Sequence, residues 1–126
     1  MAVNVVASSC WLEYLAGSEI GDRVSSAVED IGNLLVPSIS IYEVFKKLLR
    51  ESGEEYALKV AAHMSQGLVL DLDADLSIEA ARIGVERGLP LADSIIYASA
   101  ARFGATLWTQ DAHFKGLPGV VFFEKA

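Results

Sequence analysis

Short apolar runs alternate with longer amphipathic stretches along this sequence, and this alternation limits the possible folds more than any other feature. Residues 3–6 are typical, because they form a β-branched run too short for a helix, which favours a buried strand. No hairpin dipeptide joins such runs, and a helical stretch separates most of them. The sequence therefore predicts an α/β fold, a single three-layer domain with a mostly parallel β-sheet flanked by helices.

Glycines after the amphipathic stretches mark most of the predicted helix ends. The predicted strands are residues 3–6, 34–36, 68–72, 105–109 and 120–123. The predicted helices are residues 10–16 (with Ser8 and Ser9 as caps), 19–31, 38–51, 54–65, 73–87 and 90–103. In a parallel sheet of this kind, the chemistry is expected at the carboxyl ends of the strands.

Composition indicates one core and excludes several classes of protein. The chain has 126 residues, of which 52% are hydrophobic and 21% charged, so we expect residues 1–126 to form one ordered domain. The net charge of −7 excludes a general electrostatic attraction for nucleic acid, so phosphate binding would need a local basic patch or bound cations. The single Cys10 excludes an intrachain disulfide framework and a cysteine-built zinc site.

The sequence carries no recognisable targeting or membrane segment. Its first residues lack a basic region, and the longest apolar block, residues 94–101, is far shorter than the ~18–20 residues that span a bilayer. We therefore expect a cytoplasmic protein with no membrane partner.

Three carboxylates fall just after predicted strands or at the start of predicted helices. These are Glu43, Asp93 and Asp111. Crowded acids repel one another, and a divalent cation removes that penalty. Carboxylates without cysteine or histidine suit Mg²⁺, or Mn²⁺, better than Zn²⁺. Asp93 and Asp111 could each simply cap a helix, whereas Glu43 lies inside a predicted helix and caps nothing.

Four blocks of sequence, residues 5–15, 37–44, 88–98 and 107–114, extend this acidic pattern over nearly the whole chain. In order and spacing they resemble PIN-domain proteins, specifically the VapC-type toxins of type II toxin–antitoxin (VapBC) systems. The resemblance implies a Mg²⁺-dependent endoribonuclease that hydrolyses RNA phosphodiesters with a metal-activated water. It also implies a VapB-type antitoxin partner and a homodimer.

Carried over by position, the resemblance assigns Glu43, Asp93 and Asp111 to the metal and the catalytic site. It assigns Ser9 and Thr109 to the orientation of those acids or of bound water. No histidine is required for this chemistry, and His113 is interpreted as a loop residue near the site.

The chain departs from the family at one position, because Ala7 stands where the family places an aspartate at the end of the first strand. Alanine has no oxygen to coordinate metal, and loss of even an outer-shell partner costs about 10–100-fold in metal affinity or activity. We therefore expect an inactivated or impaired nuclease. The intact remainder of the pattern favours an engineered replacement over a natural pseudoenzyme.

Two other classes of function remain open on the sequence. With Ala7 in place, the chain could be a catalytically silent module that binds antitoxin or RNA. A receiver-type phosphoacceptor domain also clusters acids at strand ends, and Asp71 or Asp73 could imitate its acceptor.

Basic and aromatic residues surround Glu43 on its predicted helix. Lys46, Lys47 and Arg50 share its face and are candidates for contact with RNA or with an acidic partner, or else form an ordinary solvated face. Tyr42 and Leu49 belong to an apolar stripe whose first interpretation is core packing and whose second is a groove for an antitoxin helix.

Overall fold

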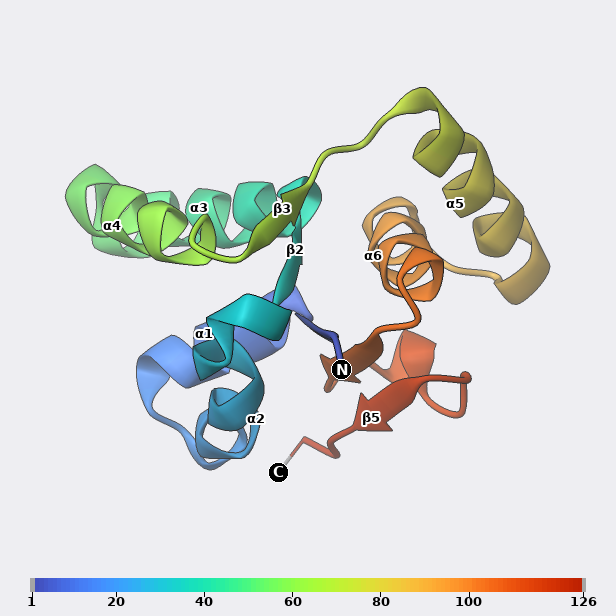
Figure 1. Cartoon of the computed structure of the whole chain (residues 1–126). Helices are drawn as coiled ribbons and strands as arrows, with labels where there is room; N and C mark the ends of the chain where they lie inside the picture. The colour runs from blue at the N-terminus through green and yellow to red at the C-terminus, as the bar shows by residue number, and fades with distance from the viewer. Residues whose placement is uncertain (1, 126) are drawn as a thin grey trace.

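The computed structural model describes residues 2–125, which form a sheet with helices on both faces (Figure 1). The strands are β1 (Asn4–Val6), β2 (Leu35–Pro37), β3 (Leu68–Leu70), β4 (Thr106–Thr109) and β5 (Val120–Phe122). The α-helices are α1 (Ser8–Ala16), α2 (Glu19–Glu29), α3 (Ser38–Ser52), α4 (Glu54–Met64), α5 (Ala74–Arg87) and α6 (Leu91–Arg102). Short 3₁₀ helices follow α2 and β4, at Ile31–Asn33 (η1) and Ala112–Phe114 (η2).

All pairings between these strands are parallel. Strand β4 lies between β1 and β5, and β2 pairs with β3. An isolated parallel bridge between Asn4 and Leu34 joins the two parts, so the strand order is β3-β2-β1-β4-β5. The parallel α/β fold expected from the alternating pattern is confirmed.

Successive residues of β1 point to opposite faces of the sheet, and each face has its own core. Val6 packs in a cluster formed mainly by α1, α2, α3 and α4. Val5 packs with Leu107 and with residues of α6. Helix α5 covers the outer side of α6, as the upper right of Figure 1 shows. This three-layer arrangement matches the expectation.

Most predicted element boundaries lie within one or two residues of the observed ones. At the end of α5, for example, Gly88 adopts φ +68°, a left-handed conformation that favours glycine, and its N–H bonds back to the Gly84 carbonyl. The predicted helix 19–31 ends earlier, at Glu29, because Asp30 leaves helical geometry with ψ 69° and η1 follows.

The expectation that Ser8 and Ser9 cap the first helix is wrong. The helix begins at Ser8, and its N-cap is Ala7, whose carbonyl accepts hydrogen bonds from the N–H groups of Cys10 and Trp11. Alanine offers no side-chain acceptor, so the first turn of α1 lacks the side-chain cap that serine or aspartate would provide.

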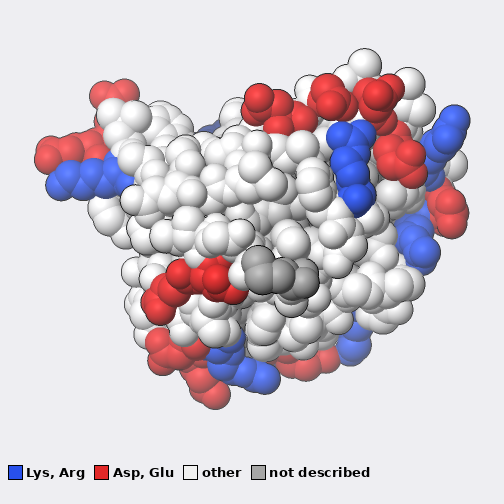
Figure 2. All heavy atoms as spheres, viewed as in Figure 1, with Lys and Arg blue, Asp and Glu red and all other residues white. Residues whose placement is uncertain are grey.

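No helix among residues 2–125 is long and apolar enough to cross a membrane. In the face shown in Figure 2, acidic side chains lie along the upper edge and at the lower left, and basic side chains are scattered among them. This face therefore offers no continuous basic surface to a nucleic acid.

Candidate active site at the carboxyl edge of the sheet

Three strand ends meet at one edge of the sheet. Strand β1 lies between β2 and β4, and the chain leaves these strands toward opposite faces, through α1 and α3 on one side and through η2 on the other. Such a reversal opens a crevice at the carboxyl ends of parallel strands. Ala7, Ser38 and Gln110 directly follow β1, β2 and β4, respectively, so their neighbours line this edge.

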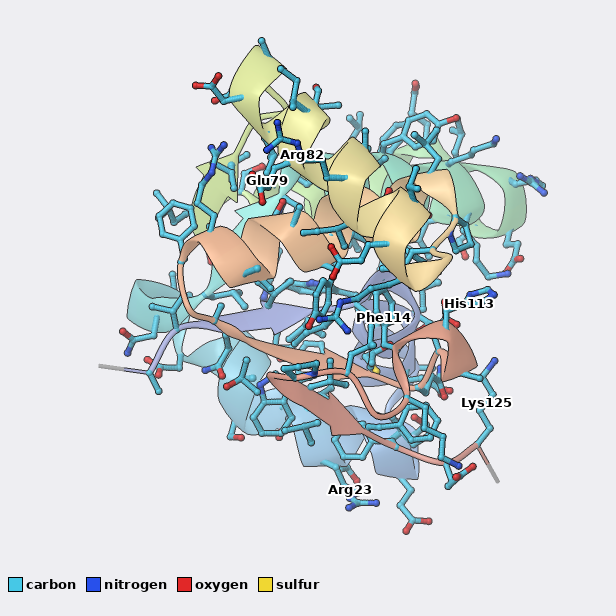
Figure 3. The ribbon with its side chains drawn as sticks, turned by 90° about the vertical axis from the view of Figure 1, so that its right-hand side faces the viewer. Arg23, Glu79, Arg82, His113, Phe114 and Lys125 are labelled. Atoms are coloured by element: carbon cyan, nitrogen blue, oxygen red, sulfur yellow. The ribbon has the colours of Figure 1, made fainter. Side chains whose placement is uncertain are left out.

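Asp93 and Asp111 come together at this edge with a third side chain, His113. The His113 Nδ1 atom lies 3.0 Å from Asp93 Oδ2 and 3.0 Å from Asp111 Oδ1. One ligand atom from each of the three residues lies within 4.8 Å of the others. Figure 3 places His113 on the short turn after β4, next to the buried Phe114.

Local backbone geometry fixes both aspartates. Asp93 lies in the first turn of α6, which begins after Pro90. Asp111 is the N-cap of η2, where its Oδ1 atom accepts a hydrogen bond from the His113 N–H at 2.9 Å. The buried Thr109 hydroxyl accepts a hydrogen bond from the Asp111 N–H at 3.0 Å. Asp111 therefore does cap a helix, and it also joins the cluster, whereas Asp93 is not an N-cap.

Burial and crowding change the acidity of Asp93. The pKa of its carboxyl is raised from 3.8 to about 6, first by burial and then by the charge of Asp111 and a hydrogen bond with it. The contact with His113 acts on this pKa in the opposite direction and lowers it. A negative charge on Asp93 is therefore less favourable than usual, and a bound cation would relieve this condition.

Glu43 lies on the other side of the crevice, in α3, and has a different kind of partner. The Ser8 hydroxyl donates a hydrogen bond of 2.7 Å to Glu43 Oε1. Glu43 is not among the three residues whose ligand atoms gather around Asp93. Ala7 immediately precedes Ser8 and is buried, so an acid at position 7 would stand between the two sides.

The polar residues predicted to orient the acids differ in their surroundings. Thr109 contacts Asp111, in line with its expected role. Ser8, expected only as a helix cap, is the serine that contacts Glu43. The sequence did contain an indication of this contact, because Ser8 directly follows position 7 at the end of the first strand.

The basic residues near Glu43 do share its face. Lys46, Lys47 and Arg50 line a shallow depression of about 250 Å³ together with Glu43 and Tyr42. Lys46 also lies over the Tyr42 ring, and Lys47 forms an exposed ion pair of 2.7 Å with Glu51. The interpretation of Tyr42 and Leu49 as core residues is wrong, because they are 60% and 44% exposed. The core face of α3 consists instead of Ser40, Val44 and Leu48.

The donor set suits a divalent cation. Two carboxylates and an imidazole nitrogen converge within 4.8 Å, and their charges are incompletely balanced in the protein alone. Sequence reasoning did not include His113 in this group. Its position two residues after Asp111, where a helix N-cap turns the chain back, was the indication that could have found it.

Comparison with known proteins gives one family and a consistent set of folds. The family model described as the PIN domain matches residues 5–120. No match is found among curated proteins. Among solved structures, a toxin–antitoxin complex from Klebsiella pneumoniae is 20% identical with a TM-score of 0.78, and the match covers 94% of this chain and 95% of that one.

Two further structures are similar over most of their length. DNA-bound VapBC from Salmonella typhimurium is 20% identical, with a TM-score of 0.72 and 98% of both chains covered. VapC20 from Mycobacterium tuberculosis, a toxin that cleaves the Sarcin-Ricin loop, is 22% identical, with a TM-score of 0.73 and with 92% of this chain and 95% of that chain covered. The family match over residues 5–120 and the shared fold show that this chain belongs to the PIN-domain family.

Proposed function

We propose that this chain is the VapC-type toxin of a toxin–antitoxin pair, a Mg²⁺-dependent endoribonuclease, with Mn²⁺ as an alternative metal, and that Ala7 impairs or inactivates it. Membership of a family of nucleases supports this proposal. The single observation that carries it is the meeting of Asp93 and Asp111 at the carboxyl edge of the sheet, with Glu43 and Ala7 on the neighbouring strand ends. We also propose that residues 1–126 form one PIN domain.

In this proposal Asp93, Asp111 and Glu43 hold the metal from two sides of the crevice. Bound Mg²⁺ would supply Lewis-acid activation of water and stabilise charge on the phosphoryl oxygens. Thr109 fixes the backbone of Asp111, and Ser8 fixes the Glu43 carboxylate. Ser8 is the first candidate for the orienting role because of its contact with Glu43, and Ser9, to which the family resemblance assigns that role, is the second.

The basic face of α3 is the proposed place for RNA phosphates or for an acidic stretch of the antitoxin. Lys46, Lys47 and Arg50 lie beside Glu43 and are exposed, so they compensate locally for the negative net charge. A VapB-type antitoxin and a second copy of this chain are the proposed protein partners. Similarity in fold to toxins captured as VapBC complexes supports the antitoxin partner.

One observation favours a second candidate function, a silent module that binds antitoxin or RNA without cutting. Ala7 is buried at the strand end between the two groups of acids and supplies no oxygen there. Membership of the PIN family removes the reason for the receiver-domain alternative.

RNA cleavage by the Ala7→Asp variant tests the proposal. We expect the variant to cut RNA with 5′-phosphate ends in Mg²⁺, with EDTA abolishing cleavage, and to exceed the Ala7 protein by at least about 100-fold. Asp75→Asn in the same background is the matched control, because Asp75 is exposed in α5, outside the acidic cluster. An Ala7→Asp protein that binds Mg²⁺ and leaves RNA intact would refute the nuclease proposal and favour the silent module.

A further inference from the structure

An open pocket of about 490 Å³ is lined by residues outside the acidic cluster, and nothing in the proposed mechanism uses it. Glu13 of α1, Arg23 of α2, Gln110 after β4 and Lys125 near the C-terminus line it. Gln110 stands between Thr109 and Asp111 in the sequence, so one wall of the pocket is only one residue along the chain from the proposed metal site. The volume is within the range of small-molecule sites and suits one nucleotide.

The pocket exists because α1 and α2 approach each other closely. Gly21 packs against the backbone of Glu13 and Tyr14, where any side-chain carbon would clash. This contact fixes the start of α2 beside the Glu13 side chain. The wall of the pocket is therefore built by the fold and does not depend on a mobile loop.

One wall combines the Glu13 carboxylate with the buried Gln110 amide. Gln110 is only 6% exposed, and its Nε2 atom donates to Glu13 Oε2 at 3.1 Å. This bond fixes which end of the amide is the carbonyl. Within residues 2–125, the buried Gln110 Oε1 atom has no hydrogen-bond donor. A buried acceptor without a partner is unfavourable, and a ligand N–H can satisfy it once the Gln110 amide turns toward the pocket.

The opposite side offers a flat cation. The Arg23 guanidinium carbon lies 4.7 Å from the centre of the Phe123 ring, and Phe123 stacks in turn on Trp108. The exposed side of this guanidinium can stack on a nucleobase, as arginine does in recognition of single-stranded RNA. In Figure 3, Arg23 projects from α2, Lys125 lies near the C-terminal end, and His113 lies above them.

The charges in the pocket favour a base with donor groups over a free anion or a metal ion. Glu13, Glu19 and Glu124 face Arg23 and Lys125, and Glu124 is also paired with Lys115 at 2.8 Å. Neither positive nor negative charge dominates the pocket. Recognition of a ligand therefore depends on the acceptors of Glu13 and Gln110 and on the flat face of the Arg23 guanidinium. Guanine is the RNA base with two adjacent donors, N1–H and N2–H, on its Watson–Crick edge.

We propose that this pocket binds an unpaired guanine of the RNA, next to the phosphate held at the acidic site. Glu13 and Gln110 read the guanine edge, Arg23 stacks on its face, and Lys125 meets its phosphate. Rotation about the terminal torsion of Gln110, which breaks the Nε2–Glu13 hydrogen bond, is what turns Oε1 toward the base. This inference rests on the proposed ribonuclease function and names a substrate preference for it.

Binding of single nucleotides to the whole metal-free Ala7 protein tests the pocket without any cleavage. We would titrate 5′-GMP, AMP, CMP and UMP and follow the side-chain amide signals of the two glutamines by NMR. GMP is expected to bind at least about tenfold more tightly than the others. It should shift the Gln110 amide and leave that of Gln66, at the end of α4, in place.

Matched variants separate recognition of the base edge from general charge. Glu13→Gln should reduce the preference for GMP about tenfold or more, whereas Glu19→Gln, which changes the same charge in the same pocket, should preserve it. Arg23→Ala should weaken the binding of all four nucleotides by a similar factor. Equal binding of the four nucleotides, an unshifted Gln110 amide, or an unchanged preference in Glu13→Gln would overturn the guanine pocket.

The two proposals fail separately. A GMP preference together with an Ala7→Asp protein that cuts no RNA would leave the pocket in place and remove the nuclease. Mg²⁺-dependent cleavage by Ala7→Asp without any GMP preference would remove only the guanine pocket.

Discussion

Glu43 and Asp93, two partly buried carboxylates of the candidate site, have different surroundings. On the α3 side, Glu43 accepts a hydrogen bond from the neutral Ser8 hydroxyl, and its neighbour at the strand end is Ala7. On the α6 side, Asp93 faces a second carboxylate and a histidine, and its pKa is raised to about 6. The α6 side therefore carries the crowded charge that a bound cation would relieve, while on the α3 side Ala7 adds no charge.

We expect the largest effect from removing a carboxylate beside Asp93. In the Ala7→Asp background, we expect Asp111→Asn to lower the rate of RNA cleavage by at least about 100-fold, because it removes a proposed metal ligand while keeping the shape of the side chain. Asp75→Asn should leave the rate unchanged. Gel analysis of end-labelled RNA measures both, and cleavage by the Asp111→Asn variant at the parental rate would contradict the assignment.

The raised pKa of Asp93 predicts a pH dependence of stability without metal. Because the folded protein holds this proton more tightly than the unfolded chain, the stabilisation is complete below about pH 4 and is lost as the pH rises through about 6. A pKa change of this size corresponds to about 3 kcal/mol, and solvent screening reduces our expectation to about 1–2 kcal/mol.

Urea unfolding of the Ala7 protein and of Asp93→Asn, each in EDTA at about pH 4.5 and about pH 7.5, measures this effect. The loss of unfolding free energy between the two pH values should be smaller in Asp93→Asn by about 1–2 kcal/mol. Equal losses of unfolding free energy in the two proteins would show that the Asp93 carboxyl does not cause the pH dependence.

A pair of serine variants tests which hydroxyl orients the Glu43 carboxylate. In the Ala7→Asp background, Ser8→Ala should lower cleavage about tenfold, because the Glu43 carboxylate loses the hydroxyl that orients it. Ser9→Ala should have a smaller effect, since Ser8 is the serine that hydrogen-bonds Glu43. The same rate measurement decides between them, and a larger effect of Ser9→Ala would restore the role that the family resemblance gives to Ser9.

The smallest expected effect concerns the cap of α1. Ala7→Asn should raise the free energy of unfolding by about 1 kcal/mol, because asparagine can cap the first turn where alanine cannot. Ala7→Asp should gain less without metal, since it adds a carboxylate one residue from Ser8 and its partner Glu43. Denaturant unfolding with and without Mg²⁺ checks this order, which would be refuted if the Ala7→Asp and Ala7→Asn variants were equally stable without metal.

The fold was predictable because periodicity and helix-stopping residues act locally. The apolar run around Val5 and Val6 indicates a strand that is buried on both faces of the sheet. Gly88 ends α5 through its own backbone conformation, which does not depend on distant parts of the chain. Ala7 as an N-cap was not predictable from preferences, because the register of β1 against β4 fixes where α1 begins and overrides a poor capping residue.

The site was only partly predictable, because side-chain contacts depend on tertiary geometry. The meeting of Asp93 and Asp111 followed from their positions at strand and helix ends. The addition of His113 and the choice of Ser8 over Ser9 for Glu43 depend on the direction in which one short helical turn points each side chain. No periodic pattern carries that information.

Binding of Mn²⁺ to the Ala7→Asp protein, followed by electron paramagnetic resonance, tests most directly whether these oxygens hold a divalent cation. We expect one Mn²⁺ site, from which Mg²⁺ displaces Mn²⁺. Its affinity should fall at least about tenfold in Asp111→Asn and in the Ala7 protein, and should be unchanged in Asp75→Asn. Mn²⁺ binding of equal strength in all four proteins, or no binding in any of them, would contradict it.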